Sequence, residues 1–107
     1  MDVINFAYTN AGEVVRLGTT PRFQLFHASK DKLPWDLTGA TILIRFTRPD
    51  YTIFTQPATI TNATSGTAEY VCTTSDLNMV GQWNREWLIT QGPLTLVSVE
   101  DIPFKVR

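Results

Sequence analysis

The sequence predicts an all-β fold, an antiparallel β-sandwich of about seven or eight strands in one domain that spans residues 1–107. Thr, Val, Ile, Phe, Tyr and Trp are plentiful, and no segment has a sustained helical repeat of apolar residues. Turn-forming clusters also recur at short intervals: TNAGE, SKDKLP, DLTG, RPDY, NATSG, NMVGQ and QGP. Short strands between such regularly spaced turns are typical of a sandwich.

Composition limits the classes of function. The chain has 107 residues, of which 43% are hydrophobic and 18% charged, and its net charge is −1. It lacks the basic excess that binds phosphates, so nucleic acid is disfavoured as a partner. The apolar runs are too short to span a membrane. The opening MDVINFAYTN has no secretory signal pattern, and we expect a complete small protein made in a cytoplasm.

The expected strands follow the alternation of apolar and polar residues along the chain. The clearest case is ATILIRFTR, where Ile42, Ile44 and Phe46 fall on one face and Leu43 falls on the other. Pro57 weakens the strand over residues 51–60 and favours a sheet edge for it. The full set of expected strands is residues 2–8 (with 1–8 as a terminal strand or arm), 20–28, 40–48, 51–60, 66–74, 82–90 and 93–107, the last broken near 101–103.

Turn chemistry delimits several of these strands. Asp36–Gly39 leads into the third expected strand, and Pro49 fixes a backbone angle in the turn that ends it. Gly92, in QGP, suits a hairpin connection. Only TTSDLNMVG has room for a helical turn, with Ser75 as its cap.

Residues with catalytic chemistry are sparse. His27 is the only histidine, and no nucleophile-elbow motif accompanies it. Cys72 is the only cysteine, which excludes an internal disulfide and a thiolate-rich zinc site, and we interpret it as a buried, unreactive thiol. The carboxylates are scattered without calcium-loop spacing, and the pair Glu100–Asp101 is interpreted as a solvated bulge. We therefore expect no enzyme, and we assign no catalytic, cofactor-binding or metal-binding residue.

The aromatic residues have two interpretations, a core or a binding platform. Trp83 and Trp87 share one side of their strand with Arg85, and the core interpretation is favoured for that side. Arg85 then reaches the rim, stacks on an indole or pairs with a carboxylate, unless a bulge shifts the alternation. Trp35, in a loop, is expected to be the most exposed indole. The basic residues around Phe46, Arg45 and Arg48, are interpreted as a solvated strand face.

The stretch MVGQWNREW looks like the corner that precedes the sixth strand of immunoglobulin folds. In those folds an aromatic residue lies two positions before the second disulfide cysteine. Trp83 takes the aromatic position here, and Arg85 takes the cysteine position. The indole N–H of Trp83 is then expected to make the hydrogen bond that a corner tyrosine makes to upstream backbone. The sandwich is thus predicted to be immunoglobulin-like.

Several short motifs also follow one another in a fixed order: LGTTPRFQLF, LPWDLTGATILIRFTRPD, SGTAEYVCTTSDLNMVGQW and REWLIT. This order resembles the immunoglobulin-like N-terminal domain of phage baseplate upper proteins, over about residues 16–106. That family has a Gly-Asp-Thr strand, an Asp-Leu-Thr-Gly-Ala strand and a Lys/Arg-Pro-Asp-Gly turn. Here the first motif is Gly18-Thr19-Thr20, and Tyr51 replaces the usual turn glycine.

The resemblance implies a non-catalytic phage virion structural protein, an adaptor or decoration protein of the tail, baseplate or capsid. It implies a place in the virion after synthesis in the host cytoplasm, with other virion proteins or further copies of itself as partners. A host-surface or carbohydrate-binding module that uses exposed aromatics remains the alternative, ahead of an enzyme or enzyme inhibitor. We expect partner contact through the terminal strand and exposed apolar residues: Val3, Ile4, Phe6, Trp35, Leu43 and Tyr51.

Overall fold

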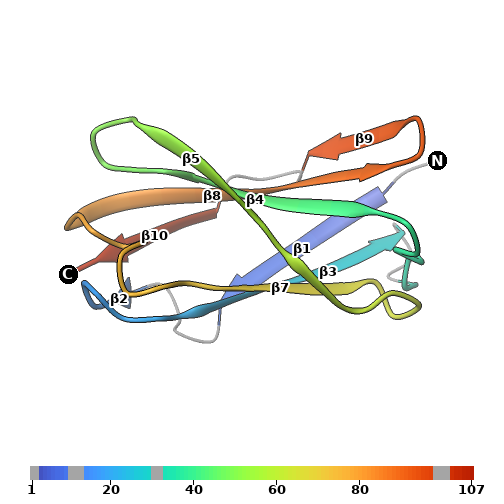
Figure 1. The fold of residues 1–107 in the computed structure, drawn as a ribbon, viewed down its shortest axis with the longest axis horizontal. Helices are drawn as coiled ribbons and strands as arrows, with labels where there is room; N and C mark the ends of the chain where they lie inside the picture. The colour runs from blue at the N-terminus through green and yellow to red at the C-terminus, as the bar shows by residue number, and fades with distance from the viewer. Residues whose placement is uncertain (1–2, 10–13, 30–32, 98–101) are drawn as a thin grey trace.

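Two β-sheets face each other in the computed structural model, which describes residues 3–9, 14–29, 33–97 and 102–107 (Figure 1). Side chains are described for residues 14–26, 33–95 and 103–107. The domain is elongated, with principal extents of 38 × 22 × 22 Å. No helix occurs in the described ranges, and none of them could therefore cross a membrane as a helix. The all-β sandwich prediction is confirmed.

The smaller sheet has four strands, and all of its pairs are antiparallel. β1 lies at one edge and pairs along its whole length with β3, from Val3 opposite Ser29 to Thr9 opposite Phe23. β6 lies at the other edge, where its register against β7 shifts between Ile60 and Asn62. In spatial order the strands are β1 (Val3–Thr9), β3 (Arg22–Ser29), β7 (Thr67–Val71) and β6 (Thr59–Asn62).

The larger sheet is organised around the long strand β8, which pairs with β4 on one side and with β10 and β9 on the other. All of its pairs are antiparallel except the short pair of β2 with β10. In spatial order the strands are β2 (Val14–Val15), β10 (Ile102–Val106), β8 (Gly81–Gln91), β4 (Thr41–Thr47) and β5 (Ile53–Pro57), with β9 (Leu94–Val97) beside β8.

The expected strand over residues 51–60 is two strands in two sheets. β5 ends at Pro57, and β6 begins at Thr59 in the opposite sheet. Pro57 has no N–H to continue the ladder, and the next N–H, of Ala58, donates to the Ile42 carbonyl at 2.9 Å. The edge position expected for this segment is confirmed for both strands.

Two other predicted features differ in detail. The last expected strand is also divided, into β9 and β10, and Pro103 lies inside β10 rather than in a break before it. The predicted bulge at Glu100–Asp101 lies outside the described residues. The segment after β7 forms a turn, with the Asp76 N–H donating to the Thr73 carbonyl at 3.2 Å, and no helical turn.

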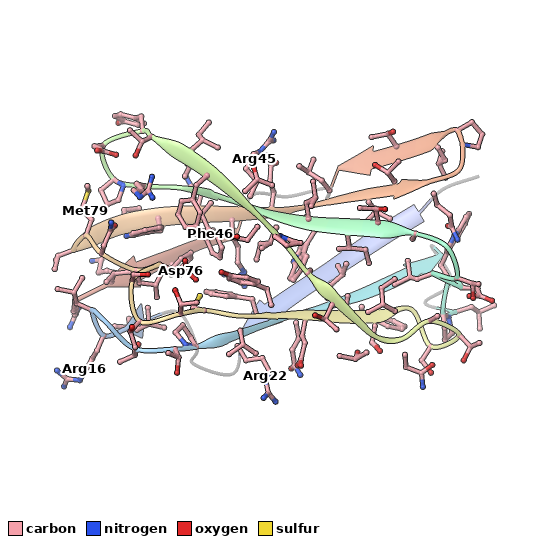
Figure 2. The ribbon with its side chains drawn as sticks, in the orientation of Figure 1. Arg16, Arg22, Arg45, Phe46, Asp76 and Met79 are labelled. Atoms are coloured by element: carbon pink, nitrogen blue, oxygen red, sulfur yellow. The ribbon has the colours of Figure 1, made fainter. Side chains whose placement is uncertain are left out.

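The core fills the space between the sheets with the inward residues of β3, β4, β8 and β10. Along β4, buried and half-buried residues alternate as the sequence predicts, with Ile42, Ile44 and Phe46 buried. Phe46 is central to the aromatic part of the core, with its ring 5.4 Å from that of Phe23 and 6.3 Å from that of Trp83. Figure 2 shows Phe46 between the sheets. The predicted joint burial is confirmed for Ile42, Ile44, Phe46 and Trp83, whereas Tyr70, expected with them, is half-buried.

Arg85 stays inside the core, and no bulge moves it out. Its register against both β4 and β10 is regular, and it is 3% exposed. The guanidinium carbon lies 4.8 Å from the ring centre of Phe23 and 5.7 Å from that of Phe104. Stacking on the negative faces of these rings offsets part of the cost of burying the charge. Burial lowers the pKa of Arg85 to about 10.

The predicted corner hydrogen bond is present. The indole Nε1 of Trp83 donates to the Met79 carbonyl oxygen at 2.9 Å. Trp83 itself is fully buried, so this bond satisfies a donor that would otherwise cost about 1–3 kcal/mol. The corner therefore ties the β7–β8 connection to the start of β8.

Candidate partner-binding surfaces

Asp76 and Cys72, which carry potentially reactive groups, are engaged in hydrogen bonds or buried in the core. Asp76 accepts from the Tyr70 hydroxyl at 2.5 Å and from the Thr73 N–H at 2.8 Å. Burial first, and then the Asp76 charge, raises the pKa of Cys72 to about 12, which keeps this buried thiol protonated at neutral pH. Among the described residues, no three His, Cys, Asp or Glu gather in a way that could hold a metal ion. His27 lies in β3, and its side chain is outside the described part.

Trp35 is held by the fold at one end of the sandwich. It is the most exposed of the three tryptophans, as expected, but it is only half-buried, not fully open. Its indole Nε1 donates to Oε1 of Gln91 at 3.1 Å. The Gln91 Nε2 in turn donates to the carbonyls of Asp36 and Thr38, both at 3.0 Å. Trp35 thus locks the β3–β4 connection to the end of β8, and partner contact through it stays a prediction.

Leu43 occupies the outer face of β4, as the sequence predicts. It is half-buried, and it lies opposite Leu88 of β8 and Pro57 of β5. These apolar cross-strand neighbours account for an apolar residue at this position. A partner at Leu43 stays a prediction.

The edges of the two sheets differ in how open they are to another strand. β1 runs for seven residues without a proline, a charge or a break in register, and among the described strands it pairs only with β3. β5 ends in Pro57, β6 has its register shift, and β2 and β9 have only two and four residues. Prolines, bulges and short lengths are the devices that protect sheet edges. β1, which contains Val3, Ile4 and Phe6, is the least protected edge described.

The two turns at the ends of β4 share one hydrogen-bonding pattern. In the leading turn, Oδ1 of Asp36 accepts from the Thr38 N–H at 2.9 Å and from its hydroxyl at 2.5 Å. In the turn after β4, Oδ1 of Asp50 accepts from the Thr52 N–H at 3.1 Å and from its hydroxyl at 2.6 Å. These threonine hydrogen bonds lower the pKa of each aspartate. Both Asp-x-Thr turns are thus locally organised.

The turn after β4, residues 48–52, presents Tyr51 to solvent. The Tyr51 N–H donates to the Arg48 carbonyl at 2.9 Å, and the Arg48 N–H donates to the Thr52 carbonyl at 2.8 Å. Pro49 fixes the first central angle, as predicted, and Tyr51 takes φ 69°. Tyr51 is 86% exposed, and the side chains of Ile53 and Val80 nearby are also largely exposed.

Arg45 and Arg48 do not form a free basic patch. Arg45 pairs with Glu86, its cross-strand neighbour on β8. Arg48 donates to the Thr52 hydroxyl at 3.1 Å and stacks over the Phe54 ring at 4.3 Å from its centre. Figure 2 shows Arg45 and Arg22 on opposite outer faces of the sandwich, and Arg22 pairs with Glu69. Arg22 and Arg45 are therefore paired with opposite charges, and Arg48 is held against the turn and the Phe54 ring.

These features define a class, a β-sandwich whose distinctive surfaces are an open strand edge and a protruding turn. The chain belongs to the family of the BppU N-terminal domain, the N-terminal domain of phage baseplate upper proteins, whose family model matches residues 21–107. The suspected resemblance is confirmed, and the match leaves β1 and β2 outside it. A comparison with curated proteins found no match. The family is one of phage baseplate structural domains.

The sequence pointed to some of these surface residues and missed others. It pointed to Tyr51 and the terminal strand, because a bulky residue at a usual glycine position of a turn and a strand at the chain end can be recognised from the sequence alone. It missed Ile53 and Val80. Ile53 had a signal, since it is an apolar residue at the start of an edge strand, whereas Val80 had none in its loop.

Proposed function

We propose that this protein is a non-catalytic structural adaptor of the phage tail that docks onto other virion proteins by protein–protein contact. The observation that carries the proposal is the family match over most of the chain, joined to a rigid sandwich with an open seven-residue edge. Cys72 is buried in the core, and the carboxylates of Asp36, Asp50 and Asp76 accept hydrogen bonds within turns. The protein's role is therefore to position surfaces.

The first docking surface is the free edge of β1. An extended segment of a partner adds there as a fifth strand, since main-chain hydrogen bonds supply the affinity and alternate side chains supply the specificity. The uncharged sequence VINFAYT offers no like-charge repulsion to an added strand. The other edges are less accessible, because β5 ends in Pro57, β6 has a register shift, and β2 and β9 are short, so the partner adds to β1.

Mass spectrometry of purified virions tests the adaptor role. We expect the protein in particles purified through two density steps, in a fixed ratio to the other tail proteins. Its absence from particles, with the protein found only in the infected-cell lysate, would contradict the proposal.

A charge placed on the strand edge tests the docking mode. We expect Phe6→Lys to reduce incorporation of a tagged copy into particles, because a lysine on an edge strand opposes strand addition. Thr59→Lys adds the same charge to β6, the opposite edge of the same sheet, and should be incorporated as the wild type is. Equal loss for both variants, or for neither, would reject β1 as the docking edge.

The alternative of a glycan-binding module finds less support in the geometry. Trp35 is half-buried, and its indole N–H is already engaged by Gln91. Flat stacking on a sugar ring requires an accessible aromatic face with polar groups converging beside it.

A further inference from the structure

The turn after β4 holds a bulky aromatic residue in a backbone conformation that suits glycine. Among the described residues, positive φ occurs at five glycines and at one other residue, Tyr51, with φ 69°. The left-handed region brings Cβ too close to the backbone and costs about 1–2 kcal/mol for a residue with a side chain. Tyr51 gives nothing back to its own fold through packing, since it is 86% exposed. Backbone strain that is not offset by packing within the protein is typical of a functional contact.

The same turn is rigid. Its backbone is closed by two hydrogen bonds, from Tyr51 N–H to the Arg48 carbonyl and from Arg48 N–H to the Thr52 carbonyl. Asp50 holds Thr52 through two more. Arg48 joins the turn to the sheet by donating to the Thr52 hydroxyl and stacking on Phe54. Tyr51 therefore projects from a fixed base, which reduces the entropy that a partner must remove on binding.

The first residue of β8 packs against the turn. Gly81 lies so close to Pro49 that a Cβ on Gly81 would come within 2.8 Å of the Pro49 Cγ. This contact seats the start of β8 against the turn, and Val80 precedes it in the chain. Val80 is 59% exposed and Ile53, two residues after Tyr51, is 60% exposed. The turn that carries Tyr51 joins β4 to β5 at one end of the sandwich (Figure 1).

We propose that Tyr51 is a docking knob that inserts into an apolar pocket of another protein of the virion, a pocket with a hydrogen-bonding group at its floor. Tyrosine suits such a site, since its ring buries a large apolar area and its hydroxyl requires a partner once it leaves water. Ile53, two residues after Tyr51, and Val80, next to Gly81, are exposed apolar side chains that the same partner can cover. A small ligand or a single sugar needs a cleft that encloses it, and an 86% exposed residue on a turn encloses nothing.

This inference rests on the proposed function but places a second contact on the sheet opposite to β1. β1 belongs to the smaller sheet, and the turn joins β4 and β5 of the larger one. An adaptor needs two separate surfaces to connect two partners, and the edge of β1 and the turn between β4 and β5 provide them.

Competition between a tagged protein and the phage-encoded copy for incorporation into virions tests the docking role of Tyr51. Cells that express tagged protein are infected with the phage that encodes it, and the tagged fraction is measured in purified particles. Tyr51→Gly should fall at least about tenfold below the tagged wild type, since a hot-spot residue contributes at least that factor. The matched control Leu33→Gly removes another largely exposed apolar side chain, from the β3–β4 connection at the opposite end, and should leave the fraction unchanged.

The outcomes separate the two proposals. Tagged wild type absent from particles would overturn the structural role itself. Tyr51→Gly incorporated as the wild type is would overturn the knob alone. Normal incorporation together with weaker adsorption of the phage to host cells would assign Tyr51 to the host surface, and would also overturn the proposal. Thermal melting of purified Tyr51→Gly, at or above the wild-type temperature, shows that any loss of incorporation is not a loss of folding.

Discussion

β4 lies between two turns that share the same aspartate–threonine hydrogen bonds but differ in the burial of the residue between the aspartate and the threonine. In Asp36-Leu37-Thr38, Leu37 is fully buried and part of the core. In Asp50-Tyr51-Thr52, Tyr51 is 86% exposed. The leading turn gives its left-handed position to Gly39, with φ 77°, whereas the other gives it to Tyr51. The leading turn thus contributes Leu37 to the core, whereas the turn after β4 holds Tyr51 in a strained backbone conformation and exposes its side chain.

The leading turn is also tied to the opposite sheet. The Leu37 N–H donates to the Ala63 carbonyl in the β6–β7 connection at 2.8 Å, and the Ala40 N–H closes the turn on the Leu37 carbonyl at 2.9 Å. Together with the bonds of Gln91 to this turn, these contacts make the leading end an internal joint. The turn after β4 is supported through its own residues Pro49, which packs against Gly81, and Arg48, which stacks on Phe54, while Tyr51 at its tip is exposed.

The largest difference between the turns should appear when each central residue is truncated. Leu37→Ala is expected to lower the free energy of unfolding by about 3 kcal/mol, because it leaves a cavity in a packed core. Tyr51→Ala should change it by less than about 0.5 kcal/mol. Urea unfolding followed by tryptophan fluorescence measures both. Similar losses for the two variants would show that Tyr51 serves the fold after all.

The support beneath the exposed turn gives the next largest effect. Gly81→Ala is expected to lower the free energy of unfolding by about 2 kcal/mol, since the new Cβ would meet the rigid Pro49 ring and the φ of 137° disfavours a side chain. Gly39→Ala has no atom within 4 Å of its new Cβ and should cost only about 1 kcal/mol of backbone strain. Denaturant titration of the pair measures the difference. A smaller loss for Gly81→Ala than for Gly39→Ala would contradict the seating of the turn on the start of β8.

Relief of strain at Tyr51 should be stabilising. Tyr51→Gly is expected to raise the free energy of unfolding by about 1 kcal/mol, because glycine adopts positive φ without the Cβ clash. Differential scanning calorimetry would record this as a higher Tm. A lower Tm would mean that the tyrosine ring makes a contact that holds the turn.

The smallest effect is the response of the two turns to acid. Hydrogen bonds from Thr38 and Thr52 lower the pKa of Asp36 and Asp50, so the ionised carboxylates are more stable in the folded protein than in the unfolded chain. This contribution is present above the unfolded pKa of about 4 and is lost as pH falls through the lowered folded values. The Tm should therefore decrease less between pH 7 and pH 2.5 in the double variant Asp36→Asn with Asp50→Asn than in the wild type. An unchanged slope would show that these hydrogen bonds add no stability.

Much of the framework was predictable from the sequence, because alternation and turn chemistry are local. Ile42, Ile44 and Phe46 show the two-residue period of a strand, and Pro49 and Gly92 lie at turns with defined backbone angles. The corner bond of Trp83 was also predictable, since it joins residues only four positions apart.

The remaining features depend on contacts between distant parts of the chain. Leu37 lies within a turn motif, where no period indicates burial. Arg85 is accommodated by the rings of Phe23 and Phe104, which come from two other strands. The bond from Trp35 to Gln91 spans 56 positions, so its indole could not be recognised as engaged.

Site-specific photo-crosslinking tests the contrast between the two turns most directly. A photoreactive phenylalanine derivative replaces Tyr51 in one tagged protein and Thr38, which is exposed in the leading turn, in another. After incorporation into virions and irradiation, we expect an adduct with another virion protein from position 51 and none from position 38. No adduct from position 51 in particles that contain the protein, or equal adducts from both positions, would contradict the assignment of Tyr51 as a docking residue.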